Sequence, residues 1–327
     1  MTRQLILDVD TGTDDAIAIM MAGLSKDLDL LGCTTVWGNH AVPVCTANTL
    51  AVLDLIGRQD VPVHQGLGKP FAPIPFLFAD HVDSEREIVH PASFPIQPST
   101  REIARQPAVE WLVETLRSAT EQITLVPVAP LTNIAAAVTI DPKIVEAVDE
   151  VVIMGGSHAL GNVTPSAEAN IWHDPVAADV VFRAGFERLV LVPLDATHRA
   201  NVTAAQNEAL RGLGTPAGTA AAALIGQRIE GYTQTQPQQM PDVAPVHDAL
   251  CVAYLLDPSV IPLRAYHVQI ETTGFASFGR TIVDTAARSG QTPNALVALD
   301  ADADLFYKLL NTTLAGPAHI QDPQSPA

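Results

Sequence analysis

The stretch from Leu5 to Met21 constrains the fold most strongly, because two apolar runs in it enclose a group of aspartates. The first run, Leu5-Ile6-Leu7, suits a buried parallel strand, and the second, Ala16 to Met21, suits a helix. Between the runs stand a turn glycine and four acidic residues: Gly12, Asp8, Asp10, Asp14 and Asp15. Ligands of open α/β sheets bind at the carboxyl ends of strands, so this pattern predicts a binding site.

The four aspartates need a positive partner, because carboxylates this close repel one another and burial strengthens the repulsion. A hard divalent cation with oxygen ligands is the simplest partner. Calcium is favoured over magnesium if further ligands come from elsewhere in the chain and include backbone carbonyls. Alternatively, Asp14 and Asp15 only stabilise a helix N-terminus. That alternative does not account for Asp8 and Asp10 at the end of an apolar strand.

Strands and helices alternate along the chain, which predicts an α/β fold with a Rossmann-like, open and mostly parallel sheet flanked by helices. Further strands are predicted at 28–37, 61–64, 123–128, 151–154 and 189–194. Helices are predicted at 46–56, 108–118, 174–184, 204–213 and 218–232. Near the C-terminus we expect a small antiparallel elaboration with strands at 266–271, 281–285 and 295–299, then a helix from Asp302 to about Leu310.

We expect one domain over residues 1–314 and a disordered tail over residues 315–327, which are rich in proline, glutamine and serine. Two irregular segments interrupt the alternation. The first, 66–106, is rich in proline and is interpreted as a lid over a pocket, because loops this long are usually functional or disordered. His81 and His90 within it are candidate substrate contacts, with surface histidines as the alternative. The second, 233–245, is predicted to be a mobile loop.

Polar residues follow several predicted strands, and a parallel sheet would bring them to one rim. Asn39 follows the strand at 28–37, although a turn or cap role is equally compatible with it. The segment 161–170 carries polar residues without hydrophobic periodicity. His247 and Asp248 open a later helix; this pair suits metal ligation and proton transfer, and helix capping by Asp248 is the alternative.

Composition excludes several classes of partner. The formal net charge of −18 argues against nucleic acid and anionic membrane surfaces as partners. No run is long and apolar enough to span a bilayer. The first residues lead directly into a strand, so no signal peptide is expected. The three cysteines are scattered, which is typical of buried thiols in a cytoplasmic protein.

Two known families open with part of the aspartate pattern. D-V-D-T-G fits the opening of haloacid-dehalogenase-type phosphatases, in which Asp8 would be the nucleophile and Asp10 the acid/base. The longer D-V-D-T-G-T-D-D-A more closely resembles the opening of the inosine–uridine nucleoside hydrolases. Later segments extend that resemblance in order: G-N at 38–39, L-V-P-V-A-P-L-T-N-I-A at 125–135, M-G-G at 154–156, G-N-V-T-P-S-A-E-A-N-I at 161–171 and H-D at 247–248. A phosphatase also needs a cationic cradle for phosphate, which is not evident here.

The resemblance implies calcium-dependent hydrolysis of the N-glycosidic bond of ribonucleosides to ribose and free base. It implies calcium ligands at Asp10, Asp15, Asp248 and the backbone carbonyl of Val128. It implies that the ribose hydroxyls are bound by Asp14, Asn39, Asn162, Glu168 and Asn170. Asp10 would take the proton of the attacking water, and His247 would assist the departing base, with Tyr232 as a further candidate. Family members are commonly dimers or tetramers.

Three positions depart from the family's usual residues. Val128-Ala129 stands where threonine and glycine are usual, and the added methyl group can shift that loop. Ala169 replaces a frequent aromatic residue, and His81-Val82 replaces the His-Gly of the first lid loop. The departures at Val128-Ala129 and at His81 motivate a third interpretation, a calcium-bound nucleoside-binding protein without turnover.

Overall fold

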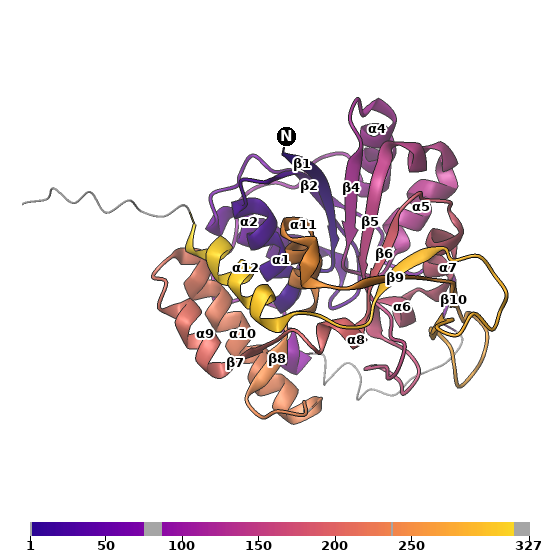
Figure 1. The fold of residues 1–327 in the computed structure, drawn as a ribbon. Helices are drawn as coiled ribbons and strands as arrows, with labels where there is room; N and C mark the ends of the chain where they lie inside the picture. The colour runs from indigo at the N-terminus through magenta and orange to yellow at the C-terminus, as the bar shows by residue number, and fades with distance from the viewer. Residues whose placement is uncertain (1, 75–86, 237, 317–327) are drawn as a thin grey trace, which may run out of the picture.

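The computed structural model describes residues 2–74, 87–236 and 238–316, and an eight-stranded sheet forms their centre (Figure 1). The strand order is β3-β2-β1-β4-β5-β6-β12-β9. The strands are β1 Arg3–Val9, β2 Leu28–Thr35, β3 Val63–Gln65, β4 Ile123–Pro127, β5 Val148–Met154, β6 Leu189–Val192, β9 Leu263–Tyr266 and β12 Ala295–Ala298. All neighbouring strands pair in parallel except β9, which is antiparallel to β12. The predicted mostly parallel α/β fold is confirmed.

Helices cover both faces of the sheet (Figure 1). They are α1 Thr13–Leu24, α2 Val42–Leu55, α4 Ala108–Ser118, α5 Thr132–Ile140, α6 Ala169–His173, α7 Pro175–Arg183, α8 Leu194–Thr197, α9 Ala204–Arg211, α10 Pro216–Thr235, α11 His247–Leu256 and α12 Ala303–Ala315. Side chains of a strand alternate between faces. Leu5 and Leu7 of β1 therefore pack with α1, α10, α11 and α12, whereas Ile6 packs with α4, α5 and α7.

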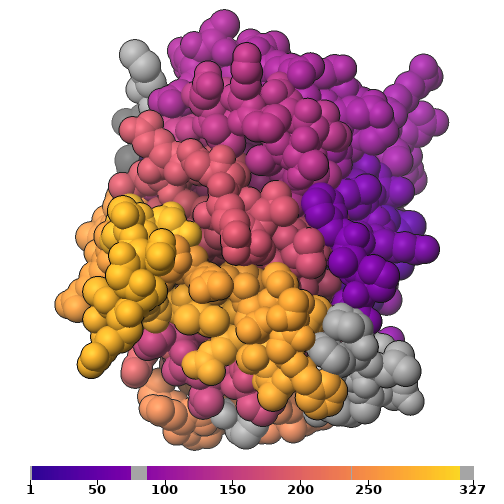
Figure 2. Space-filling view, turned by 90° about the vertical axis from the view of Figure 1, so that its right-hand side faces the viewer, coloured from indigo at the N-terminus to yellow at the C-terminus, as the bar shows by residue number. Residues whose placement is uncertain are grey.

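The C-terminal strands differ from the prediction in one respect. β10 (Val268–Ile270) and β11 (Thr281–Val283) form a small antiparallel sheet, as predicted. The strand predicted at 295–299 does not belong to it; β12 pairs in parallel with β6 inside the central sheet. Three of its four side chains are buried there. The residues around β10 and β11, in orange and gold in Figure 2, lie on the surface, and β10 contacts α7.

The segment predicted as a mobile loop at 233–245 is partly regular. Helix α10 continues to Thr235, and β8 (Val243–Pro245) pairs with β7 (Asn201–Thr203) in a second antiparallel pair. At the C-terminus α12 runs to Ala315, beyond the predicted end near Leu310, and residues 317–327 lie outside the described residues. No helix in the described part of the chain combines the length and hydropathy that crossing a membrane requires.

Candidate active site

A cavity opens at the carboxyl ends of the central strands, and most predicted site residues line it. The predicted residues in its wall are Asp10, Asp14, Asn39, Val128, Asn162, Glu168, Asn170, Tyr232, His247 and Asp248. His90 also lines the cavity, whereas His81 lies outside the described residues. Ala169 is part of the wall, at a position where the family often carries an aromatic ring.

The turn between β1 and α1 brings three of the aspartates together. The Asp15 carboxylate accepts hydrogen bonds from the backbone N–H groups of Asp10 (3.1 Å) and Gly12 (2.9 Å), so it caps the helix from within. A Cβ at Gly12 would lie 2.0 Å from Nδ1 of His90, so only glycine fits this close approach. The local sequence alone therefore determines that Asp10, Asp14 and Asp15 share one turn.

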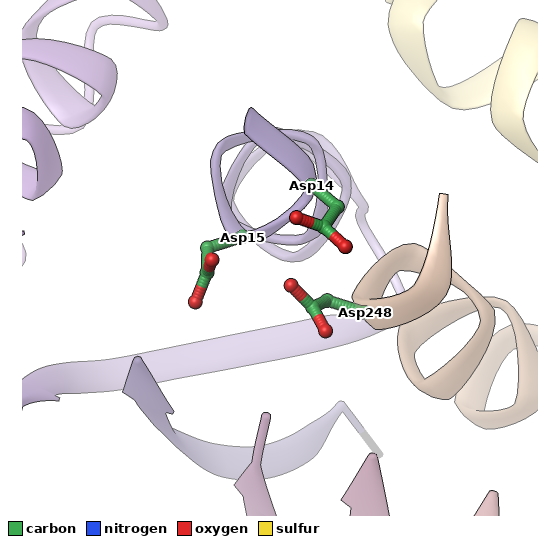
Figure 3. A group of neighbouring side chains, drawn as sticks. All are labelled: Asp14, Asp15 and Asp248. Atoms are coloured by element: carbon green, nitrogen blue, oxygen red, sulfur yellow. The ribbon is translucent and has the colours of Figure 1, made fainter. Parts of the chain in front are cut away.

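Asp248 joins this turn from the start of α11. Ligand oxygens of Asp14, Asp15 and Asp248 all lie within 4.8 Å of one another, and the three side chains are buried. Figure 3 shows the carboxylates of Asp14 and Asp248 facing each other between the two helix starts, with Asp15 beside them. The group combines segments that are far apart in the sequence because α1 packs against α11.

The charges of this group are not balanced within the protein. Burial, then the neighbouring Asp14 carboxylate, raises the pKa of Asp15 to about 7. Burial and the carboxylates of Asp14, Asp15 and Asp10 raise the pKa of Asp248 well above its ordinary value. A divalent cation bound by carboxylate oxygens would offset both causes, since it replaces lost solvation and screens the repulsion. The donor set therefore fits a metal ion with oxygen ligands.

Asp10 and Val128 lie next to this group, and their oxygen atoms accept further hydrogen bonds. The Asp10 Oδ2 atom accepts a hydrogen bond from the backbone N–H of Asn39 at 2.7 Å. The Asn39 side-chain amide lies 3.4 Å from Oδ2 of Asp15. The carbonyl oxygen of Val128 accepts a hydrogen bond from Nδ2 of Asn170 at 3.0 Å. The three carboxylates that lie closest together are therefore those of Asp14, Asp15 and Asp248. The sequence analysis expected Asp10 in this group of calcium ligands and Asp14 as a ribose contact.

Glu168 is held by backbone donors at the start of α6. Its Oε2 accepts hydrogen bonds from the N–H groups of Gly156 (2.7 Å) and Ile171 (3.2 Å), and its Oε1 accepts one from Asn170 (3.0 Å). Burial raises its pKa to about 7, although these donors oppose the shift. The carboxylate is therefore oriented by the main chain before any ligand arrives.

The two asparagines on this wall are also oriented by the main chain. Asn170 donates from Nδ2 to the carbonyl oxygens of Val128 and Met154, which directs its Oδ1 away from both. Asn162 accepts a hydrogen bond from the N–H of Ala169 at 3.0 Å through Oδ1, which leaves its Nδ2 as a donor. The wall thus presents acceptors and donors together, as a sugar with several hydroxyl groups requires.

His247 and Tyr232 form a hydrogen-bonded pair on another wall of the cavity. Nε2 of His247 lies 2.5 Å from the Tyr232 hydroxyl, and Nδ1 lies 2.7 Å from Oγ1 of Thr197. Burial, followed by the charge of Arg228, lowers the pKa of His247 well below its ordinary value. Burial therefore favours the neutral ring, and the pair offers an N–H and an O–H group as hydrogen-bond donors.

Arg228 is a residue at this site that the sequence analysis missed. Its side chain is fully buried on α10, and Nη1 lies 2.8 Å from Oδ1 of Asp14. A signal was present in the sequence, because Arg228 stands four residues from both Leu224 and Tyr232 and so shares their helix face. A charged residue on an apolar helix face indicates a buried partner.

Asp8, the nucleophile in the phosphatase alternative, lies away from the cavity wall that the described residues form. It is 1% exposed, and the β1–β2 register places it opposite Thr34. Its Oδ1 accepts hydrogen bonds from Oγ1 of Thr34 (2.6 Å) and Nδ2 of Asn133 (2.8 Å). Asp8 therefore joins strands and helices instead of facing a ligand.

Comparisons with known proteins show to which family the chain belongs. A family model described as inosine-uridine preferring nucleoside hydrolase matches residues 5–308. The chain is 36% identical over 314 residues to the pyrimidine-specific ribonucleoside hydrolase RihB of Escherichia coli strain SE11, covering 96% of this chain and 97% of the relative. It also resembles the solved structure of a purine-preferring ribonucleoside hydrolase from Gardnerella vaginalis, with a TM-score of 0.85 and 31% identity, covering 96% of this chain and 98% of that one. A plant nucleoside hydrolase, PpNRh1, matches with a TM-score of 0.87 and 29% identity over 97% and 100%.

Fold, site and relatives together define an enzyme that hydrolyses the N-glycosidic bond of ribonucleosides to free base and ribose. The chain belongs to the inosine-uridine preferring nucleoside hydrolase family. This assignment replaces the phosphatase alternative.

Proposed function

We propose that this enzyme depends on one calcium ion held by Asp10, Asp15, Asp248 and the carbonyl oxygen of Val128. The supporting observation is the convergence of the buried carboxylates of Asp14, Asp15 and Asp248 from α1 and α11, of which Asp14 and Asp248 line the cavity. Calcium is favoured over magnesium because the donors come from separate segments and combine carboxylates with a backbone carbonyl. When bound, such an ion lowers the pKa of a coordinated water and orients it.

The remaining polar residues of the wall bind the sugar in this proposal. The ribose contacts are Asp14, Asn39, Asn162, Glu168 and Asn170, all of which line the cavity. Glu168 and Asn170 are already held by backbone groups, so little side-chain ordering is needed when ribose binds. The carboxylates also favour the positive charge that develops on the sugar as the N-glycosidic bond breaks.

The chemical step uses a water molecule and two proton transfers. Asp10 accepts the proton of the attacking water; its carboxylate is held for this role by the N–H of Asn39. His247 and Tyr232, which also line the cavity, supply a proton or hydrogen bond to the departing base. The hydrogen bond between the two side chains holds them in place for this role. Such assistance is worth roughly two to four powers of ten in rate.

The test is base release from uridine, cytidine, inosine and adenosine by chelator-treated protein, before and after calcium is restored. Turnover that requires added calcium is expected, and turnover that persists in excess chelator would contradict the proposal. The panel also assigns the base preference, since one relative is named pyrimidine-specific and another purine-preferring. Tight nucleoside binding without base release over hours would favour the binding-protein interpretation.

We also propose the number of domains, the assembly and the cellular location of this enzyme. Residues 1–314 form one domain, two or four copies assemble, and the enzyme works in the cytoplasm without nucleic-acid or membrane partners. The strongly acidic net charge of −18 supports the last point. Light scattering coupled to size-exclusion chromatography measures the number of subunits, and a monomer would contradict the assembly.

A further inference from the structure

We propose that Arg228 is a positioning residue for the reaction: its guanidinium reserves the Asp14 carboxylate for the sugar and keeps it from binding the metal ion. This inference rests on the proposed function, in which Asp14 binds ribose while Asp15 and Asp248 bind calcium. It also accounts for the presence of Asp14 in the compact carboxylate group, where the metal and the sugar would compete for it.

Arg228 connects the segments that carry the metal-binding carboxylates. From α10, its Nη1 donates to Oδ1 of Asp14 (2.8 Å) and to Oγ1 of Thr13 (2.9 Å) in the first turn of α1. Its Nε donates to the carbonyl oxygen of Pro245 (2.9 Å), at the end of β8 and just before α11. One side chain thus holds both helix starts, and it is 0% exposed.

The contact restricts what Asp14 can do. One carboxylate oxygen is committed to the guanidinium, and the backbone N–H of His247 also donates to this carboxylate. A carboxylate held in this way cannot turn to chelate a metal ion through both oxygens without breaking a buried, charge-assisted hydrogen bond. Asp14 nevertheless lines the cavity, so it remains available to a sugar hydroxyl group.

The positive charge of Arg228 also weakens the binding of a metal ion at this site. The buried guanidinium contacts Asp14, whose carboxylate lies within 4.8 Å of those of Asp15 and Asp248, so its positive charge repels a divalent cation bound there. Removal of this charge leaves more uncompensated negative charge around the ion and frees Asp14 as an additional ligand. Calcium binding should therefore tighten while catalysis weakens, whereas a purely structural role of Arg228 would weaken both.

The experiment measures calcium affinity by calorimetry and steady-state kinetics with uridine and inosine, for wild type, Arg228→Met and Arg228→Lys. Arg228→Met is expected to lower kcat/KM roughly 100-fold, the usual cost of a misplaced group. Its calcium dissociation constant should fall several-fold, and an unchanged or higher dissociation constant would contradict the inference. Arg228→Lys keeps the charge and should recover part of the activity. Parallel loss of calcium binding and activity in the variants would overturn the inference.

A double-mutant cycle tests whether Arg228 acts through Asp14. If it does, the double variant Asp14→Asn/Arg228→Met should match Asp14→Asn in kcat/KM to within about twofold. Multiplication of the two separate losses would overturn the inference. If Arg228→Met does not fold, the same comparison of kcat/KM is made with Arg228→Lys in its place.

Arg188→Met is the matched control, because Arg188 forms an ion pair with the buried Glu150 outside the cavity wall. It should lower the melting temperature and leave both calcium affinity and kcat/KM unchanged. Wild-type enzyme is measured first with and without chelator. Calcium-independent turnover there would contradict the proposed function, whereas a calcium-dependent wild type whose Arg228 variants fail the expected pattern contradicts only the role of Arg228.

Discussion

The two ends of the central sheet both bury acidic side chains, but they treat the charge differently. At the amino end, Glu150 of β5 is 2% exposed, and it pairs with both Arg3 and Arg188 and accepts a hydrogen bond from the Tyr254 hydroxyl (2.8 Å). At the carboxyl end, Asp10, Asp14, Asp15 and Asp248 are buried close together, and within the described residues Arg228 is the arginine that forms an ion pair with one of them, Asp14.

This comparison indicates that Glu150 has a structural role, whereas the aspartates at the carboxyl end have a functional one. Two arginines satisfy a single glutamate at the amino end, so that end needs no partner from solution. The carboxyl end keeps an excess of negative charge that folding alone does not neutralise. A buried, unbalanced cluster is costly for stability, and it makes a metal ion part of the finished site.

The largest effect is expected for Asp10→Asn at the carboxyl end. Loss of the proposed general base should lower kcat for uridine or inosine by roughly 10³-fold, within the range for general base catalysis. Circular dichroism and the melting temperature should remain near those of the wild type, because asparagine has nearly the same volume. Retained turnover in this variant would remove Asp10 from the role of base.

His247→Ala should have the next largest effect, and its size should depend on the leaving group. We expect roughly 100-fold slower hydrolysis of natural nucleosides and a much smaller change with p-nitrophenyl riboside, whose leaving group needs no proton. Steady-state rates with both substrates provide the measurement. Equal slowing of the two substrates would show that His247 does not assist departure.

At the amino end, Glu150→Gln should change stability and not activity. The variant removes the carboxylate that pairs with Arg188 and with Arg3, although Arg3 keeps its ion pair with Asp149. This loss should lower the free energy of unfolding by about 1–3 kcal/mol. Urea denaturation measures this loss, and kcat/KM should match the wild type within error. A loss of turnover comparable to that of the aspartate variants would show that the two ends are not functionally distinct.

The smallest effect is expected for the pH dependence of the free energy of unfolding, which depends on the protonation of Glu168. Burial raises its folded-state pKa to about 7, above the ordinary value of 4.5 that holds in the unfolded chain. The unfolded chain therefore loses this proton first, and the associated stability is present below pH 4.5 and lost as the pH rises towards 7.

Glu168→Gln removes this titration and provides its own control. Between pH 5 and pH 8 the wild type should lose about 1–3 kcal/mol more unfolding free energy than the variant does. Urea denaturation of both proteins at the two pH values provides the comparison. An equal change in both proteins would mean that Glu168 is already ionised at pH 5.

Much of the fold could be predicted from local patterns, and the exceptions have a common cause. The strand β1, the helix α4 and the acidic turn between β1 and α1 follow from residues adjacent in sequence. The membership of β12 in the central sheet could not be predicted, because its pairing with β6 joins segments that are distant in sequence. A short apolar run has the same composition whether it lies at a sheet centre or in a surface hairpin.

The candidate site divides in the same way. The sequence by itself determined that Asp10, Asp14 and Asp15 share a turn, because turns and helix starts depend on a few adjacent residues. Only the tertiary structure decided that Asp248 completes their group and that Arg228 reaches Asp14 from 214 residues away. Packing of α10 and α11 against α1 sets those distances. The same packing excludes water, and the resulting desolvation raises the pKa values of the acids and lowers that of His247.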